Sequence, residues 1–321
     1  MVSAEEVVGC YKFILGRSPE NSNVVESHLS VQTLTELRLH FINSPEFLQK
    51  LGGGQMDIDA CLPSQIWEAN KVDCEASAHQ LEILLDRIRR EWEDFGRSEP
   101  HWSVLTHEKY KQDALSSNKN EFFDSGNFVA KIVTSFFERH ELSIGKSATC
   151  FELGCGVGRI TLHLARLFSH VIGADISKFH LAVCKEELKA RGVENTELLC
   201  LDTPLRLSDL QEIQFFCSFI VLQHNPPPVI TFLLDNILKK LSQGGVAIFQ
   251  VPTWRRGYAF NLNDYLNNPK PLHMEMHVLP QEQVFKIVTR NGCRIIEIRE
   301  DGWAEGRTTE TISNTFFVIK E

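Results

Sequence analysis

The chain has 321 residues, which suits two domains or one large and one small domain. Hydrophobic residues make up 43% of it and charged residues 23%, so it can bury a substantial core. Its formal net charge of -9 at pH 7 argues against a protein that mainly binds nucleic-acid phosphates, because such a protein needs clustered lysine and arginine. No run approaches the roughly 18 apolar residues of a membrane helix. We therefore expect neither a nucleic-acid partner nor a membrane span.

The nine cysteines indicate a reducing compartment. Their number is odd, no two are spaced as Cys-x-x-Cys, and several lie in apolar runs such as Leu198–Leu201. This pattern is typical of buried thiols rather than of a disulfide framework or a zinc site. The first residues also lack the basic and apolar segments of a secretory signal. We expect a cytoplasmic protein without a metal.

Residues 1–50 are predicted to form a small all-helical domain, because apolar residues recur there at helical spacing. Ser44 is placed to cap a short helix that has Pro45 at its first position. Three consecutive glycines, Gly52 to Gly54, then interrupt the pattern and mark a linker. We place the end of this first domain at residue 52.

Residues 63–95 are also predicted to be helical, with charges opposite one apolar stripe. The stripe consists of Leu81, Leu84, Ile88 and Trp92. We assign residues 53–95 to a helical linker or cap that packs on a neighbouring element. A dimerising coiled coil is the alternative, but the stripe is short for one.

From about residue 148 the pattern changes to alternating strands and helices. Strands are expected at 148–151, 170–174, 196–201, 215–222 and 246–251, with helices at 160–168, 181–191 and 230–241 between them. A helix at 281–290 and strands at 294–299 and 314–319 follow. This alternation predicts a parallel sheet with helices on both faces. We assign residues 96–321 to this α/β domain.

The first of these strands ends in the sequence Glu152-Leu-Gly154-Cys-Gly156-Val-Gly158-Arg159. Glycines after a first strand let the backbone turn sharply and approach a ligand closely. A dinucleotide site needs G-x-G-x-x-G, but here the third glycine comes one position early. This order, and the acid two residues before the first glycine, argue against a nicotinamide dehydrogenase.

This stretch resembles the first motif of the class I S-adenosylmethionine-dependent methyltransferases, and the resemblance covers roughly residues 85–321. It implies a Rossmann-like fold with a mostly parallel seven-stranded sheet, and S-adenosylmethionine as cofactor. Glu152 would help to hold the methionine ammonium. Gly154, Gly156 and Gly158 would pass under the cofactor. Cys155 of the same loop would also contact it.

The resemblance implies further cofactor contacts at the ends of the next strands. Asp175 ends the second strand and would accept hydrogen bonds from both ribose hydroxyls, beside Ile176. Asp202 follows the third strand and would accept one from the adenine amino group. Leu222, near the end of the fourth strand, completes the predicted cofactor site. All of these positions lie at the carboxyl edge, where open α/β sheets bind ligands.

The segment after the fourth strand is expected to face the acceptor. His224 is a candidate general base, because imidazole titrates near neutrality; the alternative is that it only orders the following turn. Asn225-Pro226-Pro227 resembles the start of the Asn-Pro-Pro-aromatic motif of amino methyltransferases, in which the asparagine binds the target amine. Here Pro228 replaces the aromatic residue, so a nucleobase acceptor is disfavoured.

Residues 254–279 are predicted to be an insertion that forms an acceptor pocket or lid. It is rich in aromatic residues, among them Tyr258. A strand over 273–277 would put His273, Glu275 and His277 on one face. We expect Tyr258, Glu275 and His277 to bind the acceptor, with a divalent metal or a purely structural strand as alternatives. Upstream, residues 101–106 and 122–126 are expected to cover the cofactor.

Two pieces of the first domain, Leu15-Gly-Arg17-Ser-Pro19 and Ser44-Pro-Glu-Phe47, resemble a short helical domain that accompanies bacterial glycosyltransferases. That association suggests work on glycans. The resulting hypothesis is a methyltransferase that acts on a small-molecule or glycan-type acceptor, by O-methylation. The alternatives are an amine N-methyltransferase and a catalytically silent S-adenosylmethionine-binding scaffold.

Overall fold

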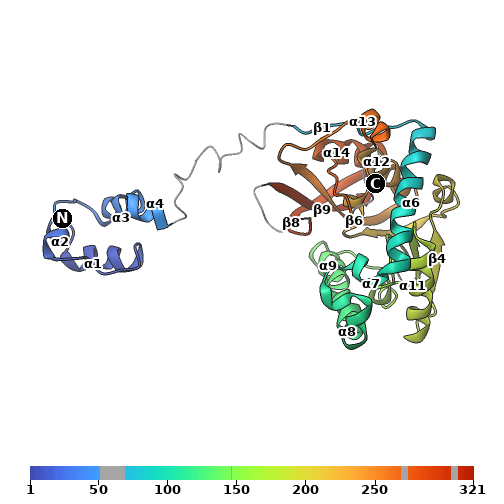
Figure 1. The fold of residues 1–321 in the computed structure, drawn as a ribbon, viewed down its shortest axis with the longest axis horizontal. Helices are drawn as coiled ribbons and strands as arrows, with labels where there is room; N and C mark the ends of the chain where they lie inside the picture. Colours follow the sequence, from blue (N-terminus) through green and yellow to red (C-terminus); the bar gives the residue numbers. More distant parts are fainter. Residues whose placement is uncertain (51–68, 146, 269–273, 305–309) are drawn as a thin grey trace. The chain divides into compact units, whose positions relative to one another are not determined.

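The structure is a computed structural model that describes residues 1–50, 69–145, 147–268, 274–304 and 310–321 (Figure 1). The chain divides into two compact units, Met1–Glu68 and Ala69–Glu321. The boundary expected at residue 52 and the three glycines at 52–54 lie outside the described residues.

The first unit is helical, as its apolar periodicity predicts. Its helices are α1 (Ala4–Phe13), α2 (Ser22–Glu26), α3 (Leu34–Ile42) and α4 (Pro45–Lys50). Val7 and Leu37 are completely buried in its small core. Ser44 accepts a hydrogen bond from the Phe47 amide, the cap expected before Pro45. Arg17 pairs with Glu46, which joins the two motifs recognised in the sequence.

The second unit contains a seven-stranded sheet in the order β4-β3-β2-β5-β6-β9-β8. Its strands are β2 (Thr149–Leu153), β3 (His170–Asp175), β4 (Thr196–Cys200), β5 (Ile213–Ser218), β6 (Leu241–Arg255), β8 (Cys293–Asp301) and β9 (Thr311–Lys320). β9 runs antiparallel to both of its neighbours, and the other pairs are parallel. The predicted mostly parallel α/β fold is therefore confirmed.

Helices cover both faces of this sheet. The face that carries Phe215 and Phe317 packs on α9 (Asn127–Arg139) and α10 (Thr161–Leu164). The opposite face carries Phe216 and Phe249 and packs on α6 (Ala78–Ser98), α12 (Pro227–Lys239) and α14 (Gln281–Arg290). The remaining helices are α7 (Pro100–Val104), α8 (Gln112–Ser125), α11 (Lys178–Ala190) and α13 (Leu262–Asn267), with short 3-10 turns η2 (Glu108–Tyr110), η3 (Pro204–Leu207) and η4 (Leu222–His224).

The predicted helix over 63–95 is only partly correct within the described residues. Residues 71–72 form a short strand, β1 (Lys71–Val72), which pairs with β7 (Ala259–Phe260). The helix α6 begins at Ala78, because Ser77 and Gln80 form a reciprocal capping box. Its apolar stripe packs inward as expected, with Leu84 and Ile88 buried.

Three other predicted elements differ from the structure. The strand expected at 215–222 ends at Ser218, because Ile220 takes a left-handed φ of 60° and the chain turns into η4. The helix expected at 160–168 ends as α10 at Leu164. β6 continues to Arg255, so the first residues of the expected insertion belong to the sheet.

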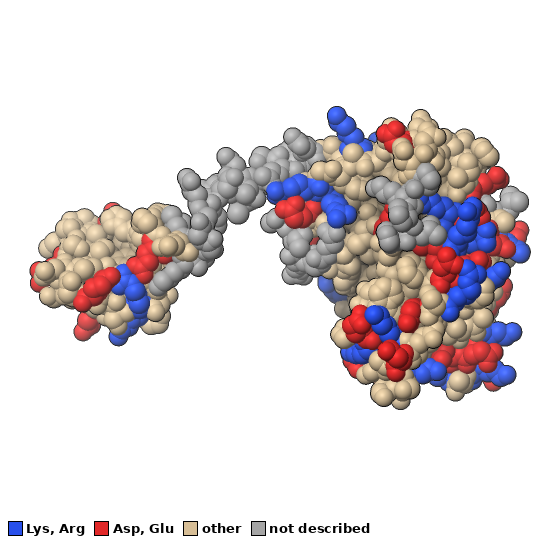
Figure 2. Space-filling view, in the orientation of Figure 1, with Lys and Arg blue, Asp and Glu red and all other residues tan. Residues whose placement is uncertain are grey.

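Within the described part of the chain, no helix is long and apolar enough to cross a membrane. Figure 2 shows positive and negative side chains interspersed on the face that carries α6. Arg89 and Arg90 on this helix both pair with Asp86.

Candidate cofactor and acceptor site

The glycine loop leaves the end of β2 and is held against the end of β3. The Gly154 N–H donates to the Ala174 carbonyl at 2.7 Å, and the Gly156 N–H donates to Asp175 Oδ2 at 2.9 Å. Gly154 and Gly156 have φ values of 75° and 54°, in the left-handed region that favours glycine. A Cβ on Gly154 would lie 2.3 Å from the Val221 side chain. Both the backbone conformation and the packing therefore require glycine at position 154.

A pocket opens beside this loop, at the carboxyl ends of β2, β3 and β5. The predicted cofactor residues that line it are Glu152, Gly154, Cys155, Gly156, Asp175 and Ile176. The predicted acceptor residue Asn225 lines it as well. The structure thus brings seven of the predicted site residues to one cavity.

Three predicted cofactor residues do not line this pocket. Gly158 is needed for packing instead, because a Cβ there would lie 2.9 Å from Cys184 Sγ on α11. The Asp202 carboxylate is nearly half exposed and pairs with Arg206 at 3.4 Å, although both of its neighbours in the chain line the pocket. Leu222 is completely buried in η4.

Glu152 places a carboxyl group at the pocket without a described cation to pair with it. Its exposed fraction is 3%, and its Oε2 accepts a hydrogen bond from Thr161 Oγ1 at 2.6 Å. Burial raises the pKa of Glu152 to about 7. A cation that enters the pocket would lower this pKa and hold the carboxyl in its ionised form.

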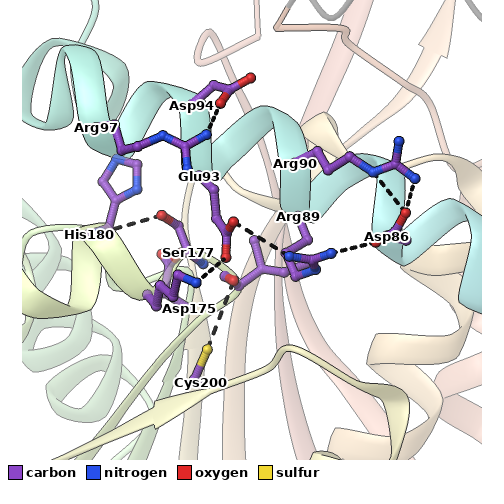
Figure 3. A network of polar contacts seen from close by, with 12 residues as sticks. Asp86, Arg89, Arg90, Glu93, Asp94, Arg97, Asp175, Ser177, His180 and Cys200 are labelled. Carbon is purple, nitrogen blue, oxygen red and sulfur yellow. Dashed lines mark hydrogen bonds and ion pairs between the residues drawn. The ribbon is translucent and has the colours of Figure 1, made fainter.

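Asp175 has two functions at the end of β3. Its Oδ2 holds the glycine loop through Gly156, and its Oδ1 accepts from the Ser177 N–H at 2.9 Å, at the start of α11 (Figure 3). A carboxylate has about four acceptor positions, so two remain for a ligand. The side chain is only partly buried and lines the pocket.

The helix α6 is fixed closely over this end of the pocket. Glu93 on α6 pairs with Lys178 of α11 at 3.9 Å. It also pairs with Arg89 of its own helix at 3.4 Å (Figure 3). A Cβ on Gly96 would lie 2.7 Å from Ser177 Oγ, so the two helices approach each other at a glycine.

The segments that cover the pocket were predicted only in part from the sequence. The residues of α6 and α7 that line it are Leu85, Ile88, Trp92, Ser103 and Val104. Ser103 and Val104 lie in the segment 101–106 that we expected to cover the cofactor. Phe122 and Phe123, in contrast, are core residues with 0% and 1% exposure. Leu85 lies outside the predicted apolar stripe, and periodicity alone gave no signal for it.

His224 is not among the residues that line the first pocket. Its Nδ1 is 3.0 Å from the Glu275 carbonyl oxygen, and its Nε2 is 3.3 Å from Gln223 Nε2. Its ring packs edge-on against Trp92. Burial lowers the pKa of His224 to about 4, so the imidazole is neutral at pH 7. These contacts favour the alternative in which His224 orders the turn.

Tyr258, Glu275 and His277 line a second cavity, beside β7 and α13. Tyr258 Oη lies 2.9 Å from His277 Nδ1, and His277 Nε2 lies 3.2 Å from Glu275 Oε2. Tyr265 Oη donates to Glu275 Oε2 at 2.7 Å, and Arg87 pairs with Glu275 at 3.4 Å. Burial alone would raise the pKa of Glu275, but the hydrogen bonds from His277 and Tyr265 and the charge of Arg87 lower it to about 2.

The strand expected over 273–277 is wrong for its described part. Residues 274–277 have no regular secondary structure, and Glu275 and His277 meet because the irregular backbone folds around η4. The His277 N–H donates to the Gln223 carbonyl at 2.7 Å. His273 lies outside the described residues. Among those described, no cluster of three or more metal-ligating side chains occurs.

The residues of the first pocket fit S-adenosylmethionine. In a complex, the buried carboxyl of Glu152 would meet the ammonium, and the remaining acceptor positions of Asp175 would meet the ribose hydroxyls. Ile176 and Leu207 would offer apolar surface to an adenine ring.

Comparison with known proteins agrees with this assignment. Residues 151–245, which contain the glycine loop, Asp175 and η4, match the sequence model of a family described as methyltransferase domain. These residues form a methyltransferase domain. The enzyme class predicted from the glycine loop is therefore confirmed. No curated protein matches the chain.

Two solved structures resemble the fold of the methyltransferase domain and its flanking elements. Magnesium protoporphyrin IX methyltransferase from Synechocystis PCC 6803, with bound SAH, is 16% identical over 73% of this chain and 98% of its own, with a TM-score of 0.50. The N-methyltransferase NodS from Bradyrhizobium japonicum WM9, in complex with SAH, is 14% identical over 73% and 99%, with a TM-score of 0.47. The first comparison supports the Rossmann-like methyltransferase fold.

We expect Gly154→Ala to abolish measurable cofactor binding, because the new Cβ would displace Val221 and shift the loop out of its left-handed conformation. The control is Gly192→Ala, at a glycine with φ of 68° where an added Cβ would have nothing within 4 Å. That variant should cost about 1 kcal/mol of stability and leave binding unchanged. Calorimetric titration with SAH compares the affinities, and urea unfolding gives the stability. Equal affinities for the two variants would contradict this role of the loop.

Proposed function

We propose that this methyltransferase domain transfers the methyl group of S-adenosylmethionine to a hydroxyl group of a small-molecule or glycan-type acceptor. The observation that carries the proposal is the single pocket lined by Glu152, Gly154, Gly156 and Asp175. When bound, S-adenosylmethionine supplies an electrophilic methyl group on a sulfonium. The protein contributes alignment of the two reactants and exclusion of water.

Each part of the pocket has a role in this reaction. Glu152 would hold the ammonium of the cofactor, and Asp175 would hold its ribose hydroxyls. Trp92 of α6 and Val104 of α7, which cover the pocket, would exclude water from it. Asn225 donates its side-chain N–H to the Val221 carbonyl at 2.9 Å, which turns its Oδ1 toward other partners. This oxygen would accept a hydrogen bond from the acceptor hydroxyl and so orient the reacting oxygen. The hydroxyl proton would leave to solvent as the methyl group is transferred, because a neutral amide is too weak a base to keep it.

The second cavity would hold the part of the acceptor that does not react. The two cavities are connected through η4, because His224, which precedes Asn225, contacts the backbone of Glu275 in the lining of the second cavity. Tyr258, Glu275 and His277 offer hydroxyl, carboxylate and imidazole groups of the kind that bind sugar hydroxyls. His224 would position this wall rather than accept a proton. The glycan-type acceptor also rests on the resemblance of the first unit to a domain that accompanies glycosyltransferases.

We place the reaction in the cytoplasm. Cys10, Cys150 and Cys217 are buried thiols, a pattern that is typical of proteins from a reducing compartment. The interspersed charges of the visible surface give no support for a nucleic-acid acceptor (Figure 2).

Calorimetric titration tests the cofactor. SAH and S-adenosylmethionine should bind the wild-type protein and NAD should not. Asp175→Ala should weaken both sulfur ligands by about 1.5–3 kcal/mol, the cost of lost hydrogen bonds to a charged group. Asp209→Ala, a change at an exposed aspartate outside the pocket, serves as the control. Binding of NAD alone, or of none of the three ligands, would contradict the proposal.

Transfer of a labelled methyl group from S-adenosylmethionine to panels of hydroxylated small molecules, glycans and amines tests the acceptor. We expect oxygen-linked product by mass spectrometry. Asn225→Ala should lower kcat, because it orients the reacting atom, whereas Tyr258→Phe should mainly raise KM. Labelled amines as the sole products would favour N-methylation, and turnover of no acceptor class would favour a silent binding scaffold.

A further inference from the structure

Arg159 is a buried cation at the pocket whose charge has no described anion beside it. It follows the glycine loop directly, lines the pocket and is 4% exposed. Its Nη1 reaches Ser125 Oγ at 3.3 Å, a long hydrogen bond, and its Nε has no partner in the described structure. None of the described carboxylates forms an ion pair with it. The nearest aromatic ring, that of Phe128, lies 5.8 Å from the guanidinium carbon.

In the protein without a ligand, burial of this unpaired guanidinium group lowers the free energy of unfolding. A guanidinium group that loses its water needs a compensating anion or several hydrogen bonds, and removal from water without them costs several kcal/mol. Burial accordingly lowers the pKa of Arg159. A cation–π contact at this distance is worth about 1 kcal/mol and does not replace an anion. An anion supplied by a ligand would remove the cost.

The opposite charge lies at the end of β2, the strand that leads into this loop. Glu152, seven residues earlier, lines the same pocket and also lacks an ion-pair partner among the described residues. The two side chains are close enough to influence each other's charge, yet they form no direct ion pair. A carboxylate and a guanidinium group held apart in this way match a ligand that carries an ammonium and a carboxylate on the same carbon atom.

We propose that Arg159 binds the carboxylate of the methionine part of S-adenosylmethionine, so that Glu152 and Arg159 together recognise its zwitterionic tail. This inference rests on the proposed cofactor. A carboxylate or phosphate of the acceptor is the competing partner for Arg159. The local chain favours the cofactor, because Glu152 at the end of β2 and Arg159 after the glycine loop line the same pocket, whereas Asn225 approaches the pocket from the segment after β5. The pair would exclude adenine nucleosides that lack the amino-acid tail.

Calorimetric titration of the full chain with three ligands tests this role. SAH carries both charges of the tail, S-adenosyl-3-thiopropylamine lacks only the carboxylate, and 5′-deoxy-5′-methylthioadenosine lacks both. The wild-type protein should bind SAH about 10–100-fold more tightly than the amine, as for a lost charge-assisted hydrogen bond. In Arg159→Met this difference should shrink to less than about threefold, with the affinity for the amine unchanged or improved. Arg166→Met, at an exposed arginine on the same segment, should behave like the wild type.

The stability of the protein without ligand separates binding from a structural role. Arg159→Met should unfold at the same urea concentration or higher, because an uncompensated buried charge is replaced by an apolar chain of similar length. Lower stability together with equal weakening of all three ligands would overturn the assignment. So would an unchanged preference for SAH in Arg159→Met, including the case in which only the KM of the acceptor rises. Failure of the wild-type protein to bind SAH would contradict the proposed cofactor itself.

Discussion

The site depends on one interaction, the hydrogen bond from the Gly156 N–H to the Asp175 carboxylate. It joins the loop after β2 to the end of β3 and fixes both at the carboxyl edge of the sheet. The same carboxylate also accepts from the Ser177 N–H and so sets the start of α11. Loop, strand end and helix are positioned by one side chain, which keeps free acceptor positions for a ligand.

The cover over this edge follows from close packing and charge pairing. Because Gly96 lets α6 approach α11, the apolar side of α6 can close the pocket while the buried Glu93 pairs with Lys178. The side of the pocket that α6 forms is therefore apolar, whereas the side formed by the glycine loop and the strand ends carries charged groups. Charged groups in such a site interact strongly with a ligand, because little water remains to screen them. Glu152 and Arg159 lie on this charged side of the pocket.

Sequence patterns predicted the fold and the position of the site at the carboxyl edge of the sheet, because glycines and acids at successive strand ends are typical of a ligand-binding sheet edge. They placed Gly154 and Asp175 in one pocket, where the structure also has them. They did not indicate that η4 would hold His224 away from the lining of the first pocket, because the left-handed turn at Ile220 has no signature in a single sequence. Sequence patterns also did not predict that Tyr258 and Asn225 line different cavities. This placement depends on the irregular path of residues 274–277.

Hydrogen–deuterium exchange with and without saturating SAH tests most directly whether the cofactor binds under α6 at this edge. We expect slower amide exchange in residues 153–157, in residues 175–177 and in the C-terminal half of α6. Exchange in the first unit and around Tyr258 should not change. Protection confined to the residues of the second cavity, or spread evenly over the chain, would contradict it.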